Sequence, residues 1–571
     1  MIVCIAEKPS VASEIAKILG ARSKKDGYYE GNGYQVTWTF GHLCQLKSPD
    51  AYSPQWKRWD MASLPIIPPR FEVELIATPS VKKQFKVIKT LYRNASEIIN
   101  CGDAGQEGEL IQRWVMQLAG VRCPVKRLWI SSLTEESIRQ GFRHLKLQSN
   151  YDTLYEAGLA RAEGDWLLGM NATRLYTLRY GDSHQVLSVG RVQTPTLAMI
   201  VARDKEIELF QPQPFWLLTT RYRGTLFTCT QGRFSLEEEG QRSLSTTKGR
   251  QLIIKDVLQK HGSEQPPQLY DLTSLQMVCN SQYGFSADTT LKIIQSLYEK
   301  KLTTYPRVDT KYLSEDLYVK CPGILRNLTT ICTGARQLLG KPLPKSKRVF
   351  DNSKITDHHA IIPSGDIRNY PKLNDAELKV FGQVVCRFCA VFYPDCEYTQ
   401  TIVLATVGNV NFKAIGRTVL HEGWRVVYGR ENEEYGSGEY ESMSFPVFRV
   451  GESGLHTPSL AQKTTLPPRH YTEASLLQAM ESIKIGRPSS RAAIIETLLK
   501  RNYIRREKRY LISNAPGRYL LDVIQADMLK SPELTALWER KLHGIEEGHY
   551  TLSQFMDELQ QELVDIIHKV G

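Results

Sequence analysis

The first 150 residues alternate short apolar runs with stretches of helical periodicity. Residues 2–6 (IVCIA) and 97–102 (EIINCG) have the length of buried strands, and 125–131 (VKRLWIS) fits a third. A helical pattern follows each run, and the last helix opens at Thr134 with two acids in its first turn, where the helix dipole favours them. Strands that alternate with helices indicate a parallel sheet, whose ligands gather at the carboxyl ends of the strands.

Charged residues stand at two of these strand ends. Glu7 and Lys8 follow the first strand, and Asp103, Glu107 and Glu109 follow the second within DAGQEGE. One interpretation is a helix N-terminus with solvated acids, which is a common arrangement. The other is a Mg²⁺ site, because Mg²⁺ takes hard oxygen ligands including a few carboxylates, and the order strand, acid, glycine, acid, helix favours it. The chain has no GxxxxGK[ST] motif, so we expect no P-loop.

The rest of the chain changes character twice. Residues 152–205 and 270–398 are mainly helical in pattern, whereas 214–260 and 399–465 are rich in strand and turn signals. A β region interrupted by a helical insertion is the economical interpretation.

A polar cluster lies between glycine and proline breaks near the end of the first helical stretch. It consists of Arg191, Gln193 and Thr194. The cluster fits a capped helix start and a phosphate cradle equally well.

An internal repeat links the helical insertion to the C-terminal part. At an offset of 201 residues, apolar and aromatic positions match, beginning with Tyr270 and Tyr471. Both copies predict helix, turn, helix and then strands, a pattern that suits a winged-helix unit and nucleic-acid binding. Tyr305 falls opposite Arg506, so only the first copy carries this tyrosine.

The segment KLTTYPRVDT places Tyr305 before a proline, with Arg307 two residues later. A strand-like run from Leu302 to Tyr305 is expected to end at Pro306, which cannot donate a ladder hydrogen bond. Tyr305 and Arg307 share a face of an extended chain. A phenol can act as a nucleophile, and an Arg fork matches phosphate oxygens. A structural tyrosine beside a surface Arg is the alternative.

The histidine and cysteine patterns give weaker evidence for a functional site than the stretches above. Asp357, His358 and His359 are consecutive, but no further metal ligand stands at suitable spacing, so on this pattern alone structural histidines are the better interpretation. The 11 cysteines are scattered, and Cys386 and Cys389 form the sole CxxC motif. Without a second pair, a zinc site is not expected, and we infer structural thiols in a reducing compartment.

Composition is compatible with a polyanionic partner. The 571 residues exceed a single core and suggest several domains. Lys and Arg number 73 and Asp and Glu 61, which gives a net charge of +12, and the pI is about 9.0. Such a charge supports association with nucleic acid without proving it. No apolar run is long enough for a membrane span, and the opening MIVCIAEKPS does not fit a signal peptide.

Five stretches in order resemble signatures of type IA DNA topoisomerases, most closely the bacterial topoisomerase III group. The Glu7–Lys8 loop with DAGQEGE is similar to the Toprim signature, LTTYPRVDT to the active-site tyrosine motif and TDHHAIIPS to the histidine motif. SVGRVQTPTL and YTEASLLQAMESIKIGRPSSRAAIIETL resemble two further signatures. The resemblance spans nearly the whole chain.

The resemblance implies a multi-domain α/β plus α+β fold in the form of a toroid. Its parts would be a Toprim parallel-sheet domain, a β-rich arch and two winged-helix-like domains. The expected boundaries are 1–150 for Toprim, 151–213 with 466–571 for a winged-helix-like DNA-binding domain, 214–269 with 399–465 for the arch, and 270–398 for the winged-helix-like tyrosine domain.

It also implies the chemistry. Tyr305 would attack one DNA strand and hold its 5′ end as a phosphotyrosine, and after strand passage the break would be rejoined without ATP, so that negative supercoils relax or linked DNA is decatenated. The residues implied are, for catalysis, Tyr305, Arg307, Lys8, Glu7 and His358; for Mg²⁺, Glu7, Asp103 and Glu107; and for DNA contacts, Arg191, Gln193 and Thr194.

The expected partner is single-stranded or underwound DNA, with a helicase or single-strand binding protein as a candidate helper. A cytoplasmic, nucleoid-associated monomer without membrane contact is expected.

The sequence departs from the family pattern in three motifs. Gly105 stands where many members carry a second Toprim aspartate, Val308 and Ser364 replace threonines, and no cysteine-rich zinc tail follows. A Toprim nuclease or primase, which would not need Tyr305, and an inactive single-strand-binding scaffold, suggested by Gly105, are the alternative interpretations.

Overall fold

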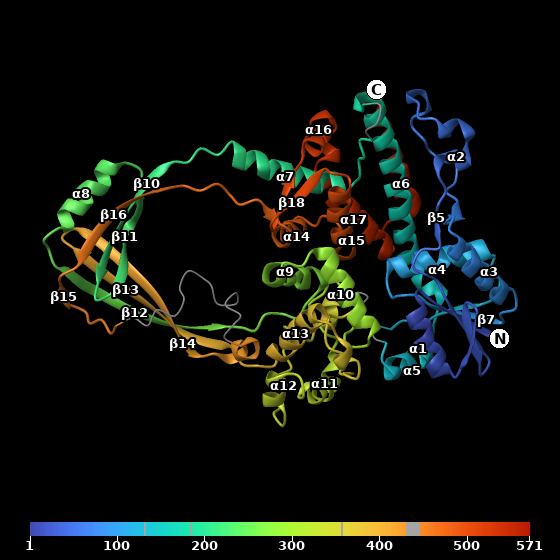
Figure 1. Ribbon diagram of the computed structural model, residues 1–571, viewed down its shortest axis with the longest axis horizontal. Coiled ribbons are helices and arrows are strands. Elements are labelled where there is room, and N and C mark those ends of the chain that lie inside the picture. Colours follow the sequence, from blue (N-terminus) through green and yellow to red (C-terminus); the bar gives the residue numbers. More distant parts are fainter. Residues whose placement is uncertain (131–132, 183–185, 356–357, 430–445, 571) are drawn as a thin grey trace.

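A computed structural model describes the chain from residue 1 to 570, apart from 131–132, 183–185, 356–357 and 430–445. Asp357, predicted beside His358, therefore lies outside the described residues. The ribbon follows a ring-like path, with a long antiparallel sheet at one end, an α/β unit at the other and helices between them (Figure 1).

The N-terminal α/β unit is built on a seven-stranded sheet in the order β2-β3-β4-β1-β7-β8-β9. The four central strands, β4, β1, β7 and β8, run parallel, whereas the pairs β2–β3, β3–β4 and β8–β9 are antiparallel. The prediction of a parallel sheet thus holds for the centre, and the edges make the sheet mixed. The strands are β1 Ile2–Ala6, β2 Ser23–Lys25, β3 Tyr28–Gly31, β4 Tyr34–Trp38, β7 Glu97–Cys101, β8 Val125–Arg127 and β9 Lys146–Leu147, and a separate pair is β5 Cys44–Leu46 and β6 Val73–Leu75.

Helices cover both faces of this sheet because its central strands are apolar on both sides. Along β1, Val3 and Ile5 enter the core shared with α3 and α4. Cys4 and Ala6 point to the opposite core, which continues into residues 269–392. The helices of this unit are α1 Pro9–Leu19, α2 Pro49–Tyr52, α3 Pro79–Arg93, α4 Gln106–Ala119 and α5 Glu135–Arg143, and Thr134 caps α5 as expected.

A helical body joins the middle of the chain to its C-terminal part. One core contains apolar residues of α6, α7 and α14–α18, and its centre includes Trp538, whose ring lies edge-on to Phe555 at 5.1 Å. A small sheet in the order β17-β19-β18 lies beside α7. The elements are α6 Asp152–Tyr180, α7 Gln193–Glu208, α14 Glu473–Ser482, α15 Pro488–Lys500, α16 Ala515–Val523, α17 Pro532–Glu546, α18 Leu552–Val570, β17 Tyr471–Thr472, β18 Ile504–Glu507 and β19 Tyr510–Ser513.

The strand-rich segments before and after the helical insertion form one antiparallel sheet in the order β15-β12-β13-β14-β11-β10-β16. Strands from both segments alternate in it, which confirms a β region split by an insertion. One helix, α8 Glu237–Thr247, packs on the sheet and was not predicted. The strands are β10 Pro214–Tyr222, β11 Thr225–Phe234, β12 Leu252–Glu264, β13 Cys396–Val407, β14 Val410–His421, β15 Ser453–Gly454 and β16 Thr457–Thr464.

The internal repeat is visible in the helices. In the insertion, α9 Leu272–Tyr283 and α10 Ala287–Glu299 begin 201 residues before α14 and α15. Capping boxes open both first helices, at Asp271 and at Thr472. The copies pack on each other, and the Glu473 carboxylate accepts a hydrogen bond from the Ala287 amide at 2.7 Å.

The predicted strands of the first copy are absent from the described residues. β18 and β19 follow α15, but α10 is followed by irregular chain and then by α11 Cys321–Leu328, α12 Thr333–Leu338 and α13 Asp375–Ala390. The expected strand from Leu302 to Tyr305 is likewise wrong. Thr303 forms only an isolated bridge to Pro363, and Tyr305 lies in irregular chain because it has no neighbouring strand there.

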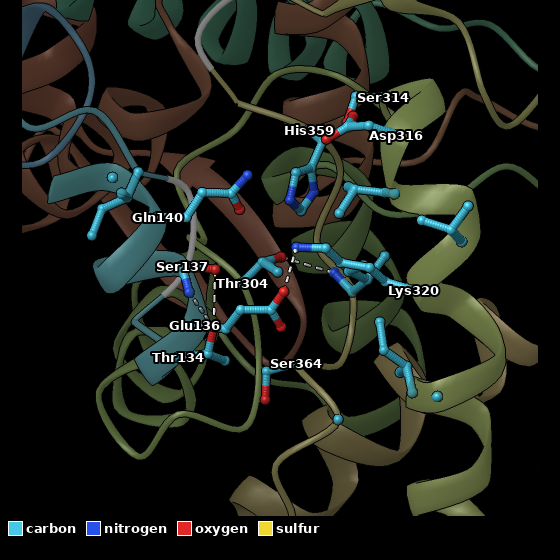
Figure 2. Close-up of a pocket in the computed structure, with 18 of the residues that line it drawn as sticks. Thr134, Glu136, Ser137, Gln140, Thr304, Ser314, Asp316, Lys320, His359 and Ser364 are labelled. Atoms are coloured by element: carbon cyan, nitrogen blue, oxygen red, sulfur yellow. Dashed lines mark hydrogen bonds and ion pairs between the residues drawn. The ribbon is translucent and has the colours of Figure 1, made fainter. Parts of the chain in front are cut away.

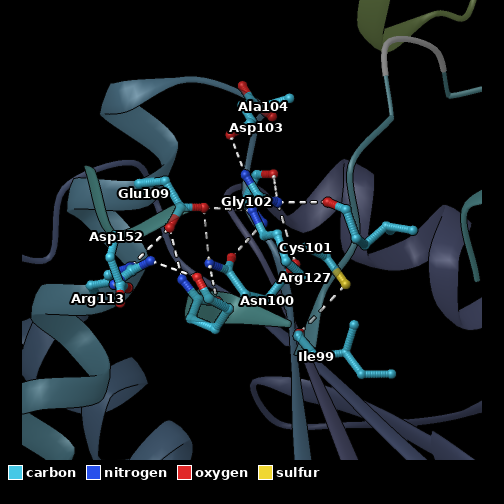
Figure 3. A network of polar contacts seen from close by, with 12 residues as sticks. Ile99, Asn100, Cys101, Gly102, Asp103, Ala104, Glu109, Arg113, Arg127 and Asp152 are labelled. Atoms are coloured by element: carbon cyan, nitrogen blue, oxygen red, sulfur yellow. Dashed lines mark hydrogen bonds and ion pairs between the residues drawn. The ribbon is translucent and has the colours of Figure 1, made fainter. Parts of the chain in front are cut away.

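A buried ion pair fixes the turn between β7 and α4 (Figure 3). Arg127 at the end of β8 donates to Glu109 at 2.5 Å, and both side chains are fully buried. The same guanidinium donates to the carbonyl oxygens of Gly102 at 2.7 Å and Asp103 at 2.8 Å. Glu109 also accepts from Arg113 at 2.9 Å. One side chain therefore determines the path of the loop that carries Asp103.

We expect Arg127→Met to destabilise the N-terminal unit by about 3–5 kcal/mol, because it leaves the Glu109 carboxylate buried without its main partner. Hydrogen exchange of the β7 and α4 amides under native conditions measures this loss. Arg139→Met is the matched control, since Arg139 pairs with Glu135 on the exposed face of α5 and should change little. Equal protection in the two variants would contradict the role given to Arg127.

Candidate active site

Tyr305 lies at the junction of the helical insertion and the N-terminal unit. It is only 9% exposed, and its ring meets that of Tyr298 edge-on at 5.6 Å. The neighbouring Thr304 amide donates to the Ile362 carbonyl at 3.0 Å, which fixes the segment. Burial, followed by the charges of Asp103 and Glu7, raises the pKa of Tyr305 well above its ordinary value. The resting side chain is therefore a neutral phenol.

His358 packs against Tyr305 and contacts the acid-bearing loop. The two rings are 4.4 Å apart, and His358 Nε2 is hydrogen-bonded to the carbonyl oxygen of Ala104. Burial lowers the pKa of His358 to about 4, so the ring is neutral at physiological pH and Nε2 carries the donated proton. Its Nδ1 is buried and has no hydrogen-bond partner within the described part of the chain.

Glu7 and Asp103 form a carboxylate pair at the carboxyl ends of adjacent parallel strands, as the sequence predicted. Burial and the charge of Asp103 raise the pKa of Glu7. Burial also raises the pKa of Asp103, against the opposing charges of Lys8 and Arg307. Two buried carboxylates that repel each other in this way suit a divalent cation, which would favour both ionised forms.

Glu107 stands apart from this pair. Its exposed side chain is bonded to His42, which lowers the pKa of Glu107. Glu7, Lys8, His42, Glu107 and Arg307 line a common cavity of about 630 Å³. Among the described residues, no three His, Cys, Asp or Glu side chains converge closely enough to hold a metal ion. The structure thus brings together two of the three predicted metal ligands and leaves the third across the cavity.

Two predicted cations line the cavities at this junction. Arg307 is exposed and lines both the cavity beside Glu7 and a second one of about 380 Å³. Lys8 lines the first cavity, and its Nζ lies 3.4 Å from Glu299. The two predicted cations therefore reach the same region from different units of the chain.

The second cavity extends from Tyr305 and His358 toward the helical body and is rich in arginine. Its lining includes Arg161, Arg191 and Arg487. Arg191 pairs with Asp165 at 2.8 Å and with Glu539 at 2.9 Å. A guanidinium can bind phosphate oxygens, but Arg191 and Arg487 are already paired with carboxylates here, so a nucleic-acid phosphate would compete with Glu539 for them.

The other two predicted DNA contacts do not line this cavity. Gln193 is buried and accepts a hydrogen bond from Arg501. The Thr194 hydroxyl accepts from the Gly190 amide at 3.0 Å, at the start of α7. Gln193 therefore contacts the residue that follows α15, and Thr194 holds the loop before α7, whose first turn has no side-chain cap.

Several lining residues were not predicted. Arg161 and Glu539 lie in helices whose patterns gave no chemical signal, and His42 follows an unpredicted strand. Arg487 had a usable signal, because it lies between glycine and proline immediately before α15.

A third cavity of about 770 Å³ lies between α5 and the insertion. Figure 2 shows Thr304 and His359, the neighbours of Tyr305 and His358, facing polar side chains of α5. Lys320, the last residue of a short 3₁₀ helix (Glu315–Lys320), pairs with Glu136 at 3.5 Å. The cavity was not anticipated because its two walls are distant in sequence.

Within the described residues, no helix has the length and apolar character needed to cross a membrane.

Comparisons with known proteins agree on one family. A family model described as DNA topoisomerase matches residues 149–557, and a Toprim domain model matches residues 2–133. DNA topoisomerase 3 of a Bacillus cereus strain is 36% identical over all of this chain and 81% of its own length. DNA topoisomerase 3 of Bacillus subtilis (strain 168) is 35% identical over 98% of this chain and 80% of its own length.

A solved structure supports the same fold. Full-length topoisomerase I from Thermotoga maritima superposes with a TM-score of 0.78 at 23% identity, covering 99% of this chain and 90% of that one. The resemblance seen in the motifs is confirmed, and the chain belongs to the type IA DNA topoisomerases, within the topoisomerase III group.

Proposed function

We propose that this topoisomerase cleaves one DNA strand through Tyr305, with Glu7, Lys8, Arg307 and His358 acting around the scissile phosphate. The observation that supports this most directly is the meeting of a buried phenol, a carboxylate pair and two cations at one junction, beside an arginine-lined cavity. Relaxation of a negatively supercoiled plasmid with Mg²⁺ and without ATP is the direct test of the activity.

The protons that must move during cleavage suggest a role for each residue. The phenol must lose its proton as its oxygen bonds to phosphorus, while the departing 3′ oxygen must gain one. Without a bound cation, Glu7 is suited to carry that proton, because its pKa is raised to about 8; a cation on the carboxylate pair would shift Glu7 toward its ionised form. Arg307 and Lys8 would stabilise the charge on the phosphate, and His358 would position the Tyr305 ring. Exchanging one phosphodiester for another conserves bond energy, so rejoining requires no ATP.

Mg²⁺ is the proposed cofactor, with Asp103 and Glu7 as its principal ligands. The ion commonly keeps several waters and uses only one or two carboxylates, which fits this pair. When bound it would supply positive charge next to the phosphate. Glu107, whose Oε1 is bonded to His42, would be the third ligand of the proposed set.

The substrate proposed within DNA is a single-stranded or underwound region, because base pairing hides the strand that one nucleophile must grip. Arg191 would contact its backbone in the arginine-lined cavity, and Gln193 and Thr194, which follow it at the start of α7, are the other two proposed DNA contacts. A helicase or single-strand binding protein could supply the open strand. We propose a monomer that acts in the cytoplasm on the nucleoid.

We retain the predicted domain division as a proposal about function. It would be 1–150 Toprim, 151–213 with 466–571 for DNA binding, 214–269 with 399–465 for the arch, and 270–398 for the tyrosine domain.

We expect Tyr305→Phe to abolish relaxation while single-strand binding is kept, because only the phenol oxygen is removed. Plasmid relaxation and filter binding of an oligonucleotide measure the two properties. Tyr298→Phe is the matched control, since this neighbouring phenol is buried against Tyr305 and has no proposed bond to phosphorus. Wild-type relaxation by Tyr305→Phe would rule out the assignment.

In EDTA, the contribution of Glu7 to the free energy of unfolding should fall as pH rises from about 4.5 to about 8, its ordinary and folded pKa values, while the lowered pKa of His358 acts in the opposite direction below about 6.5. In this window the folded state holds a proton that the unfolded state has released, so raising the pH favours unfolding. Mg²⁺ should raise the melting temperature more at the upper end of the window than at the lower end, because it binds the ionised pair.

Thermal melts of wild type and Glu7→Gln, with EDTA or Mg²⁺, test this expectation. Glu7→Gln should flatten the pH dependence, whereas Glu135→Gln, on the exposed face of α5, should keep it. A Mg²⁺ effect that is the same at both pH values and unaffected by Glu7→Gln would contradict the proposed ligand pair.

Gly105 carries the sharpest departure from the family pattern. Its φ of 146° lies in a region that favours glycine, and the space where a Cβ would stand is open. A side chain here is therefore strained by the backbone, typically by about 1–3 kcal/mol, without being blocked by neighbours. We expect Gly105→Asp to lower the Mg²⁺ concentration for half-maximal relaxation relative to Gly105→Ala, which carries the same strain without the carboxylate. Equal midpoints would mean that position 105 does not face the metal.

A further inference from the structure

Two cysteine side chains meet outside the cavities at Tyr305, and a third lies one helical turn from them. Cys332 lies immediately before α12, and Cys386 and Cys389 lie one turn apart on α13. The Sγ atoms of Cys332 and Cys389 are 3.9 Å apart, and Cys386, one turn before Cys389, lowers the pKa of Cys332. The CxxC pair thus gains a third sulfur from a distant part of the sequence.

The directions of the pKa shifts favour a thiolate at Cys332 over one at Cys386 or Cys389. Hydrogen bonds from Cys386 and then from Cys389 hold the pKa of Cys332 well below its ordinary value, with help from the amides of Ala335 and Gly334. The same contacts raise the pKa of Cys386 and Cys389, so their protons remain in place. Of the eleven cysteines, all within the described residues, Cys332 is the only one whose pKa is lowered.

Access and spacing distinguish Cys332 from a structural thiol. It is half-buried, whereas Cys389 behind it is buried. A partly exposed thiolate next to a second thiol is the arrangement in which oxidation of one sulfur is followed by a disulfide with its neighbour. The sulfurs need to approach by about 2 Å to reach a disulfide bond length. Metal binding is less well supported, because no metal-holding group of three such side chains is found among the described residues.

We propose that Cys332 is a peroxide-reactive thiol that Cys389 converts to a disulfide. In the first step the Cys332 thiolate attacks one oxygen of hydrogen peroxide, the O–O bond breaks and hydroxide leaves. The sulfur loses two electrons to the peroxide and becomes a sulfenic acid. In the second step the Cys389 sulfur attacks that of Cys332, the S–O bond breaks, and the oxygen leaves as water with the Cys389 proton.

The Cys332–Cys389 disulfide would join the start of α12 to α13, close to the 3₁₀ helix that follows β14 of the long antiparallel sheet. The Tyr393 hydroxyl donates to the Gly334 carbonyl at 2.8 Å. On its other side Gly334 faces Val427, in a 3₁₀ helix (Gly423–Tyr428) that follows β14. None of the three cysteines lines a cavity at Tyr305. Plasmid relaxation therefore serves as an independent check that a cysteine variant is folded.

The test is a hydrogen peroxide time course on the reduced full-length protein. Differential alkylation and mass spectrometry follow each cysteine. Cys123 is the matched reference, since it is also half-buried but burial raises its pKa. We expect Cys332 to react at least about tenfold faster than Cys123, because the thiolate is the reactive form. A Cys332–Cys389 linked peptide that disappears on reduction should accumulate.

Variants separate the two steps. Cys332→Ser should lose the linked peptide and keep plasmid relaxation, and Cys123→Ser should behave like wild type. Cys389→Ser should leave a sulfenic acid at Cys332, trapped by dimedone, or shift the link to Cys386. The proposal is overturned if Cys332 reacts no faster than Cys123, if the linked peptides lack Cys332, or if a metal ion bound as purified protects the three thiols.

Discussion

The active site depends on a guanidinium that never reaches it. Arg127 is fully buried at the end of β8, and its hydrogen bonds hold the carbonyl oxygens of the turn before α4. Burying such a charge is unfavourable unless it is paired and fully hydrogen-bonded, and Glu109 with the turn carbonyls provides both. The turn is therefore fixed from beneath, which leaves the Asp103 side chain free to face Glu7. Without this support, two repelling carboxylates would move apart into water.

Tyr305, the proposed nucleophile, belongs to the helical insertion, and His358 connects it to this turn of the N-terminal unit. His358 bonds the Ala104 carbonyl, the residue after Asp103, and its ring lies against Tyr305. Ion pairs Lys8–Glu299 and Lys301–Glu14 join the same two units at their edges. The turn therefore positions the Asp103 carboxylate directly and the Tyr305 phenol through His358. Besides the apolar core that both units share, the turn itself is held to the second unit by one backbone hydrogen bond, ring packing and partly exposed ion pairs, which are individually weak contacts.

The sequence predicted what is encoded locally. Strand ends, the DAGQEGE turn and the helix pairs of the repeat follow from periodicity and capping residues, and β1 and β7 place Glu7 and Asp103 together as expected. The sequence could not show that the irregular chain around Tyr305 pairs with residues near Pro363 instead of forming a strand. Nor could it show that Cys332 meets a CxxC pair or that Arg161 meets Gln106, because these contacts join elements distant in sequence and depend on packing alone.

The contacts of the next residue, Gln106, explain why a glycine stands at position 105. Gln106 is 3% exposed; its amide oxygen accepts from Arg161, and its amide nitrogen donates to Glu546. Burial lowers the pKa of Arg161 to about 10, and Arg487 and Arg191 add like charge. A neutral amide is the side chain that can serve a buried cation and an anion at once, since a carboxylate would repel Glu546 and a cation would repel Arg161. For Gln106 to enter this position, α4 must begin immediately after a residue with φ of 146°, which is Gly105. The glycine therefore has a structural reason of its own: it lets the metal-bearing turn join the arginine-lined cavity through Gln106.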